Sequence, residues 1–236
     1  MNFNSYHNEH NQFYSGGYPL GMYMSNTFLW MFLGLLITFG TAIFCWLSGM
    51  SFLMLSGLGM IMVTAMQLIL VLVLSALIER LTVGAARFCF IGYSVLTGLT
   101  LSVYLYLFEL TSLLFVFLIT SLFFGVFAMY GRMTKNDLSS LRSILTGGLI
   151  TLIVYGLISL FIPGLSMLDT VMNLAGIAIF LAFTAYDVQK IQHFYYYYQN
   201  DVQMLEKATI FSALELYLDF INLFLRLVQV LGKRRD

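Results

Sequence analysis

The sequence predicts an all-α integral membrane protein with seven transmembrane helices, and three observations support this fold class. The 236 residues are 60% hydrophobic and only 9% charged, whereas soluble domains have about 25% charged residues. Seven apolar segments each approach the length of about 20 residues that crosses a bilayer. The loops between these segments are short, and their basic residues fall in every second loop.

The seven apolar segments define a single transmembrane domain over residues 27–232. In chain order the segments are 27–47, 52–78, 88–108, 112–130, 144–162, 170–186 and 208–231. Residues 1–26 contain no Lys or Arg and are rich in Asn, Tyr, Gly and His, so we expect a polar, disordered cytoplasmic tail rather than a signal peptide. Residues 233–236 form a basic C-terminal tail.

The positions of the basic residues predict how the helices are oriented. The second-to-third, fourth-to-fifth and sixth-to-seventh loops hold Arg80, Arg87, Arg132, Lys135, Arg142, Lys190 and Lys207. By the positive-inside rule, these loops and the N-terminus of a multipass cell-membrane protein lie in the cytoplasm. Seven crossings then place Lys233, Arg234 and Arg235 outside, against that rule. Either the last helix does not cross completely, or the earlier loops outweigh this short tail, which is the topology we expect.

The last apolar segment differs from the others because polar residues recur along it. These residues are Ser212, Glu215, Asp219, Asn222, Arg226 and Gln229. Their spacings of three and four place them on one face of a helix. A carboxylate or guanidinium at the centre of a membrane helix costs roughly 2.5–3.5 kcal/mol to insert. Such a face should meet protein or water rather than lipid, so we expect this helix to be the centre of the bundle and to carry the function.

The connection between the sixth and seventh segments, residues 190–207, contains four consecutive tyrosines at 195–198. These rings can anchor at the membrane interface, continue the sixth helix into the cytoplasm, or contact a partner. Interface anchoring is the expectation, because aromatic belts are common at that depth.

Two stretches resemble the Bax inhibitor-1 family, also called the transmembrane Bax inhibitor motif family, in its bacterial form. They are AYDVQKIQ at 185–192 and ALELYLDFINLFLRLVQVLG at 213–232. Gly98, in the stretch GYSVLTGLTLS, adds weaker support. The resemblance extends over residues 27–232 and implies a seventh helix surrounded by the other six.

The resemblance also implies a function, because some bacterial members of that family behave as pH-sensitive calcium leak channels. By that resemblance, Asp187 and Asp219 match a pair of aspartates that share a proton and sense pH. Arg80 falls where bacterial members have an arginine that latches onto the aspartate of the sixth helix. Glu215, Asn222 and Arg226 are expected to be supporting polar groups. The bilayer, calcium ions and protons are then the expected partners, with calcium as the conducted ion and no tightly bound cofactor.

Physical chemistry is compatible with such a gate. Two carboxylates close together in a poorly hydrated site cannot both ionise cheaply, so they titrate as a coupled pair. A nearby Arg80 favours the ionised form through a charge-assisted hydrogen bond. Either protonation of the pair weakens this contact or deprotonation changes the spacing of the pair, and either event gives a bistable gate.

Asp187 and Asp219 also form a sparse acidic site for calcium. Calcium prefers about 6–8 oxygen ligands, and these two residues supply few of them. We therefore expect transient calcium occupancy during conduction rather than tight storage.

Two other functions use the same acidic residues. The protein is alternatively a non-conducting regulator that binds a protease or another membrane protein, or a proton-coupled transporter in which the acids relay protons. An enzyme is not expected, because the sequence lacks HExxH, Walker and GxSxG motifs. The context of an intramembrane aspartyl protease is also absent, since Asp219 follows LYL. The zero net charge argues against a nucleic-acid partner.

Overall fold

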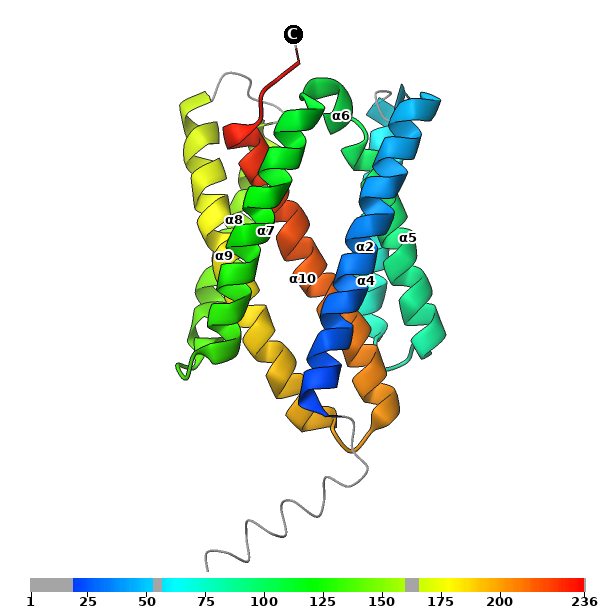
Figure 1. The fold of residues 1–236 in the computed structure, drawn as a ribbon, viewed down its shortest axis with the longest axis vertical. Helices are drawn as coiled ribbons and strands as arrows, with labels where there is room; N and C mark the ends of the chain where they lie inside the picture. The colour runs from blue at the N-terminus through cyan, green and yellow to red at the C-terminus, as the bar shows by residue number, and fades with distance from the viewer. Residues whose placement is uncertain (1–18, 53–56, 160–165, 236) are drawn as a thin grey trace, which may run out of the picture.

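The computed structural model describes residues 19–52, 57–159 and 166–235, which fold into a bundle of helices (Figure 1). The elements are α2 (Leu20–Ser48), α4 (Gly57–Leu77), α5 (Val83–Leu101), α6 (Tyr104–Leu107), α7 (Leu110–Met133), the short 3-10 helix η1 (Leu138–Leu141), α8 (Arg142–Ser159), α9 (Ser166–Tyr198) and α10 (Val202–Leu231). Within these described ranges, seven helical segments are long and apolar enough to cross a membrane, with α5 and α6 counted as one. The predicted fold class is confirmed.

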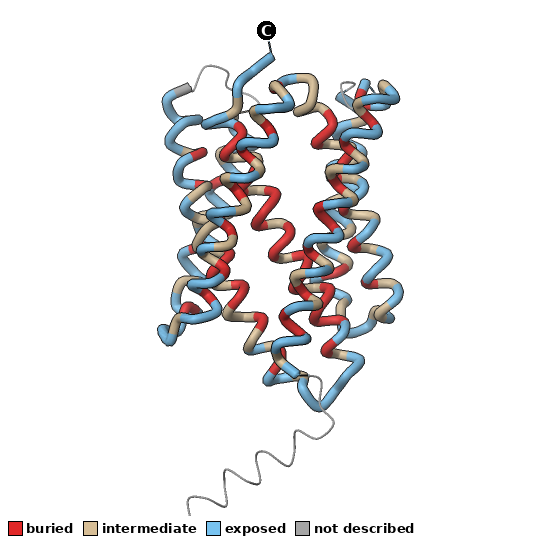
Figure 2. The backbone as a smooth tube through the Cα atoms, in the orientation of Figure 1, coloured by how far each residue is buried: buried red, intermediate tan, exposed pale blue. Residues whose placement is uncertain are grey.

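The helix α10 lies at the centre of the bundle. In its most apolar stretch 72% of the residues are buried, compared with 6% to 33% in the other six membrane-spanning segments. The backbone coloured by burial shows α10 as the most continuously buried helix, running diagonally between α2 and α7 (Figure 2). The surrounding helices expose many apolar side chains, whereas α10 packs against α2, α5, α7 and α9. The expected central position of the seventh helix is therefore confirmed.

Two groups of helices enclose α10. On one side α2 packs against α5, and α4 packs against the outside of α5. On the other side α7 and α8 pack against α9, and α9 forms an antiparallel hairpin with α10 (Figure 1). Polar contacts attach α10 to the first group: the Tyr217 hydroxyl is 2.6 Å from Thr38 Oγ1, which donates to the Ser94 carbonyl at 2.9 Å.

Small residues permit the closest helix contacts. A Cβ atom on Gly98 of α5 would lie 2.6 Å from the Thr38 carbonyl oxygen of α2. A Cβ atom on Gly131 of α7 would overlap the backbone carbonyl of Ala185 in α9. Close backbone approach of this kind is the usual role of glycine between membrane helices. The second contact lies two residues from Asp187, so it holds this part of the α9 backbone close to α7.

Several expected boundaries differ from the observed ones, and two of the differences affect the predicted features. The first helix begins at Leu20 rather than at residue 27, and residues 1–18 of the expected tail lie outside the described part of the chain. The sixth helix, α9, ends at Tyr198 rather than at residue 186. The four tyrosines therefore continue the helix, and the expectation that they form part of a loop is wrong. The reason is packing: Val188, Ile191 and Tyr195 repeat at helical spacing and are buried.

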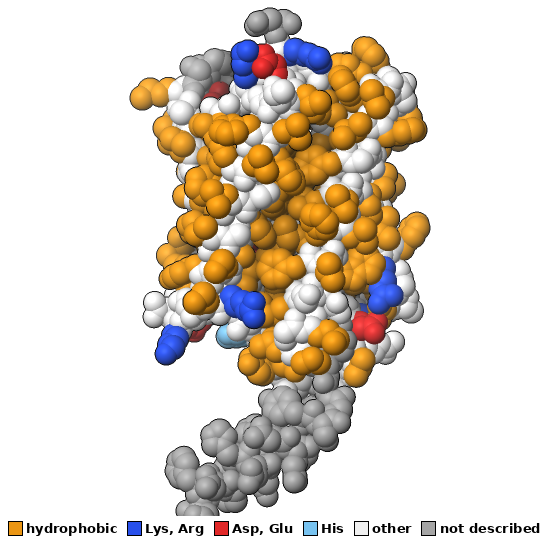
Figure 3. Space-filling model, viewed as in Figure 1, with side chains coloured by type: hydrophobic (Ala, Val, Ile, Leu, Met, Phe, Trp, Pro, Cys, Tyr) orange, Lys and Arg blue, Asp and Glu red, His pale blue; other side chains and the backbone are white. Residues whose placement is uncertain are grey.

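The C-terminal tail lies at the end of the bundle opposite the start of α2 (Figure 1). Lys233 Nζ is 2.6 Å from Glu109 Oε1, and the backbone amide of Arg235 donates to the Leu107 carbonyl at 3.0 Å. The last helix therefore passes from one end of the bundle to the other, as the favoured topology requires. The space-filling view shows charged side chains at both ends and an apolar band between them (Figure 3). Which end faces the cytoplasm stays a prediction.

Replacing Gly131 by alanine should destabilise the protein by about 1–3 kcal/mol, because the added methyl group has no space beside Ala185. Gly125→Ala is the matched control on the same helix, since nothing lies within 4 Å of its added Cβ atom. We expect the control to be neutral or to gain up to about 1 kcal/mol from helix propensity. Thermal unfolding of both variants in detergent micelles measures the difference, and equal melting temperatures would contradict the close contact of α7 with α9.

Candidate functional site

The antiparallel hairpin of α9 and α10 brings the two predicted aspartates together. Asp187 is only 6% exposed and Asp219 only 5%. Their carboxyl groups lie within hydrogen-bonding reach of each other. Asp187 was expected to close its helix, but α9 continues for about three further turns, so the pair lies inside the bundle.

A second pair of charges lies beside the aspartates, in the direction of the turn between the two helices. Lys190 Nζ is 2.6 Å from Glu215 Oε1. The Lys190 ammonium group also lies over the rings of Phe194 and Phe211, at 5.3 and 5.4 Å from their centroids. These ring contacts favour the charged form of lysine in a partly buried place.

The helical period explains this arrangement. Lys190 follows Asp187 by three residues, so both side chains lie on one face of α9. Glu215 precedes Asp219 by four residues, so both side chains lie on one face of α10. Because the helices are antiparallel, the Asp187/Asp219 and Lys190/Glu215 pairs form successive layers. The rings of Phe194 and Phe211, whose centroids are 6.2 Å apart, form a third layer.

The site contains more negative than positive groups. The carboxylate of Glu215 is close enough to repel negative charge on both aspartates, and Lys190 is the cation that attracts all three carboxyl groups. Asp219 Oδ2 is completely buried and accepts no hydrogen bond from any donor in the described part of the chain. A buried carboxylate oxygen without a donor is costly to keep ionised. The aspartate pair is therefore suited to hold a shared proton.

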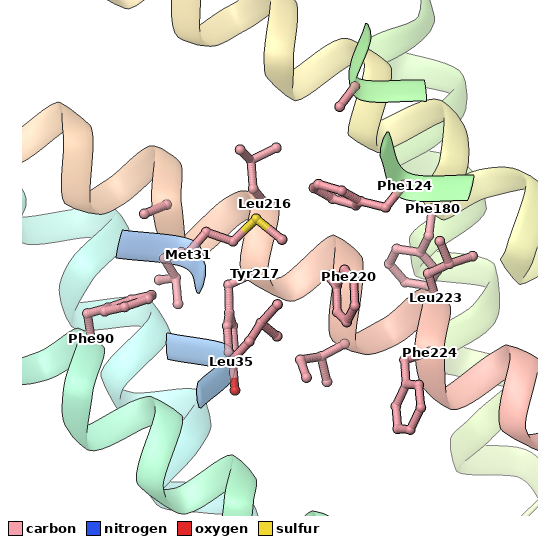
Figure 4. Close-up of a cluster of buried hydrophobic side chains, with 14 of the residues drawn as sticks. Met31, Leu35, Phe90, Phe124, Phe180, Leu216, Tyr217, Phe220, Leu223 and Phe224 are labelled. Carbon is pink, nitrogen blue, oxygen red and sulfur yellow. The ribbon is translucent and has the colours of Figure 1, made fainter. Parts of the chain in front are cut away.

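Apolar side chains pack around the turn of α10 that follows Asp219. Phe124 of α7 and Phe180 of α9 lie around Phe220 and Leu223 of α10 (Figure 4). The Phe124 and Phe220 ring centroids are 5.6 Å apart. Because both aspartates are buried in this apolar surrounding, electrostatic interactions between their carboxyl groups are stronger than in water.

The polar face of α10 continues beyond the aspartates toward the C-terminal end. Arg226 Nη1 donates to Asn173 Oδ1 of α9 at 2.9 Å. Both residues line a polar pocket of about 280 Å³ between α8, α9 and α10. Asn222 also lines this pocket, and its side-chain amide donates to the Leu218 carbonyl at 2.8 Å. The three predicted supporting residues therefore lie in two places. Glu215 lies beside the aspartates, whereas Asn222 and Arg226 line the polar pocket.

Arg80 is not close to the aspartates in this arrangement. It is exposed in the turn after α4, and within the described ranges no ion pair joins it to Asp187. The first turns of α10 dock at the same turn, where Lys207 Nζ donates to the Glu79 carbonyl at 3.0 Å. The latch role of Arg80 stays a prediction that this geometry does not support.

Lys190 is the functional-site residue that sequence reasoning missed. It was assigned to a cytoplasmic loop because α9 was expected to end before it. Its spacing of three from Asp187 was the available signal, provided that the helix continued.

Calcium ligands are few at this site. In the portion of the chain that the structure describes, no three Asp, Glu, His or Cys residues converge in a way that could hold a metal ion. Glu215, the third nearby carboxylate, is instead paired with Lys190. The residues present offer two carboxyl groups, which is compatible with passing contact by a cation but not with a closed coordination shell.

Sequence comparison agrees with this architecture. The family model Bax1-I, described as "Inhibitor of apoptosis-promoting Bax1", matches residues 20–236. Inner membrane protein YbhL of Escherichia coli is 36% identical over 222 residues, which cover 92% of this chain and 93% of YbhL. An uncharacterized protein of Deinococcus radiodurans is 34% identical over 214 residues, 91% of each chain. Protein RP147 of Rickettsia prowazekii is 41% identical over 157 residues, 66% of each chain. The chain is therefore a multipass membrane protein that belongs to the Bax inhibitor family.

Proposed function

We propose that the protein is a calcium leak channel whose opening depends on the protonation of the Asp187/Asp219 pair. The observation that carries the proposal is the buried contact between these two carboxyl groups, one of them on the central helix. Family membership supports the same function, because the resemblance to bacterial members implies a pH-sensitive leak. Calcium is here the transported substrate and not a resident cofactor.

The proposed gate follows from electrostatics. While the pair shares one proton, the two helices can remain in contact through a hydrogen bond between the carboxyl groups. Loss of that proton leaves two like charges side by side. At an effective dielectric constant of 20, two unit charges 4 Å apart repel by about 4 kcal/mol. This energy is comparable to that needed to shift a two-state equilibrium strongly, so it can change the position of α9 against α10.

Lys190 and Glu215 form the latch in this proposal. Their ion pair joins α9 to α10 one turn away from the aspartates. The charge of Lys190 also stabilises negative charge on the aspartates, which couples the latch to the gate. Asn222 and Arg226 line the polar pocket on the C-terminal side of the aspartates, and in this proposal that pocket connects the gate with water.

Replacing both aspartates by asparagine should abolish the pH dependence of calcium flux. Asparagine keeps the size and hydrogen-bonding capacity of the side chain but does not titrate. Calcium flux into liposomes that contain the purified protein, measured across a pH series, is the test. A double variant Asp187→Asn, Asp219→Asn with the wild-type pH profile would disprove the gating proposal.

Asp137→Asn is the matched control, because Asp137 lies in the turn before η1, outside the membrane-spanning segments. Hydrogen bonds from the backbone amide and hydroxyl group of Ser139, both 2.9 Å long, hold the pKa of Asp137 below its usual value. It therefore stays ionised throughout a pH series near neutrality. The control variant should retain the wild-type profile.

Lys190→Met should move the pH of half-maximal flux upward by about 1 unit or more, because loss of a neighbouring positive charge disfavours ionisation of the carboxyl groups. The exchanged pair Lys190→Glu, Glu215→Lys keeps an ion pair between the helices and should recover part of the shift. The same liposome assay measures both variants. An unchanged midpoint in Lys190→Met would rule out the electrostatic coupling of the latch to the gate.

The same preparations separate the two alternative functions. Saturable uptake of a solute driven by a pH gradient, without calcium flux, would identify a proton-coupled transporter. Specific co-purification of another membrane protein, with no flux from the purified chain, would identify a regulator.

A further inference from the structure

An apolar slot opens between α2 and α7, in the half of the bundle nearest the C-terminus. Its volume is about 270 Å³. Apart from Tyr104, its wall consists entirely of apolar side chains, which include Phe39, Leu105, Leu114, Phe117 and Phe224. Phe224 belongs to the central helix, so the slot reaches from the lipid-facing surface to α10.

Three aromatic rings close the inner end of the slot. Phe39 of α2 and Phe117 of α7 meet edge to face, with ring centroids 4.9 Å apart. Phe39 also lies 5.7 Å from the ring of Phe224. Beyond these rings α2 and α7 stand apart, and the face between them is apolar in the space-filling view (Figure 3).

Basic residues lie at the outer end of the slot. Arg235 Nη1 donates to the carbonyl of Leu105, a residue of the slot wall, at 3.4 Å. The Arg235 guanidinium group also lies 6.0 Å from the ring centroid of Trp46. Lys233 is paired with Glu109, whereas neither Arg234 nor Arg235 forms an ion pair with any residue that the structure describes.

We propose that this slot binds one acyl chain of a bilayer phospholipid, with the lipid phosphate beside Arg235. The slot faces the hydrocarbon of the bilayer, and an apolar cavity does not attract water. Its volume exceeds the roughly 150 Å³ of an apolar protein cavity that binds benzene. A phospholipid matches both the apolar wall of the slot and the basic Arg235 at its outer end. It combines an apolar acyl chain with a negatively charged phosphate at the depth of the membrane interface.

The bound chain would complete the packing of the central helix. It would touch Phe224, one turn beyond Phe220 and on the same helix as Asp219. Because Phe224 forms part of the slot wall, a chain bound in the slot would reach α10 directly. This inference concerns binding and does not rest on the proposed calcium flux.

A photo-crosslinking experiment on the full-length protein tests the slot. The probe is phosphatidylcholine that carries a diazirine on one acyl chain, incorporated into vesicles with the protein. Mass spectrometry should find the label concentrated on peptides from the slot walls of α2 and α7. Labelling spread evenly over the lipid-facing surfaces would overturn the proposal.

Leu114→Trp fills the slot and should lower labelling of its walls severalfold. Leu118→Trp is the matched control one turn away on α7, because Leu118 is 66% exposed and does not line the slot. Equal labelling of the two variants would overturn the proposal. Both substitutions are at exposed positions, and equal thermal unfolding of the variants verifies that the fold is retained.

The position of the phosphate is tested separately. Arg235→Gln should lower labelling by the phosphatidylcholine probe severalfold and leave labelling by a diacylglycerol with the same diazirine unchanged. Equal effects on both probes, or no effect on either, would disprove the contact of Arg235 with the phosphate.

Discussion

The fold depends on one constraint: polar groups inside a membrane must find protein partners, because the surrounding hydrocarbon offers none. The helix α10 carries Glu215, Asp219 and Arg226, which could not face lipid without a large cost. The other helices have almost entirely apolar outer surfaces and lose nothing by facing the bilayer. Placing α10 at the centre satisfies this constraint and makes its polar face the interior of the molecule.

The contacts on the two sides of α10 differ in chemical character. On one side, the layers formed with α9 contain the carboxyl pair and the Lys190/Glu215 ion pair. On another, Tyr217 joins α10 to α2 and α5 through hydrogen bonds and aromatic contacts. A contact held by charge responds to pH, whereas a contact held by ring packing does not. In the proposed mechanism the α9 side therefore moves while the α2 and α5 side stays fixed.

The lipid slot and the proposed gate share the central helix. Phe220 packs against Phe117 and Phe124 of α7 near the carboxyl pair, and Phe224 forms part of the slot wall. Movement of α10 would change the shape of the slot, and a chain bound in the slot would resist that movement. Binding energy that differs between two arrangements shifts the balance between them. Lipid occupancy and proton occupancy would then act on the same element.

The sequence by itself determined the seven membrane crossings, the single polar face of the last helix and the pairing of Asp187 with Asp219, because hydropathy and helical spacing are local properties and the two motifs resemble a known family. The tertiary structure decided which other charges join the pair. It extends α9 to Tyr198, brings Lys190 to Glu215 and leaves Arg80 exposed. The physical reason is that a partner on another helix depends on where helices end and on how they rotate against each other. Those quantities are set by packing, such as the close approach of Gly131 to Ala185, and not by spacing along one helix.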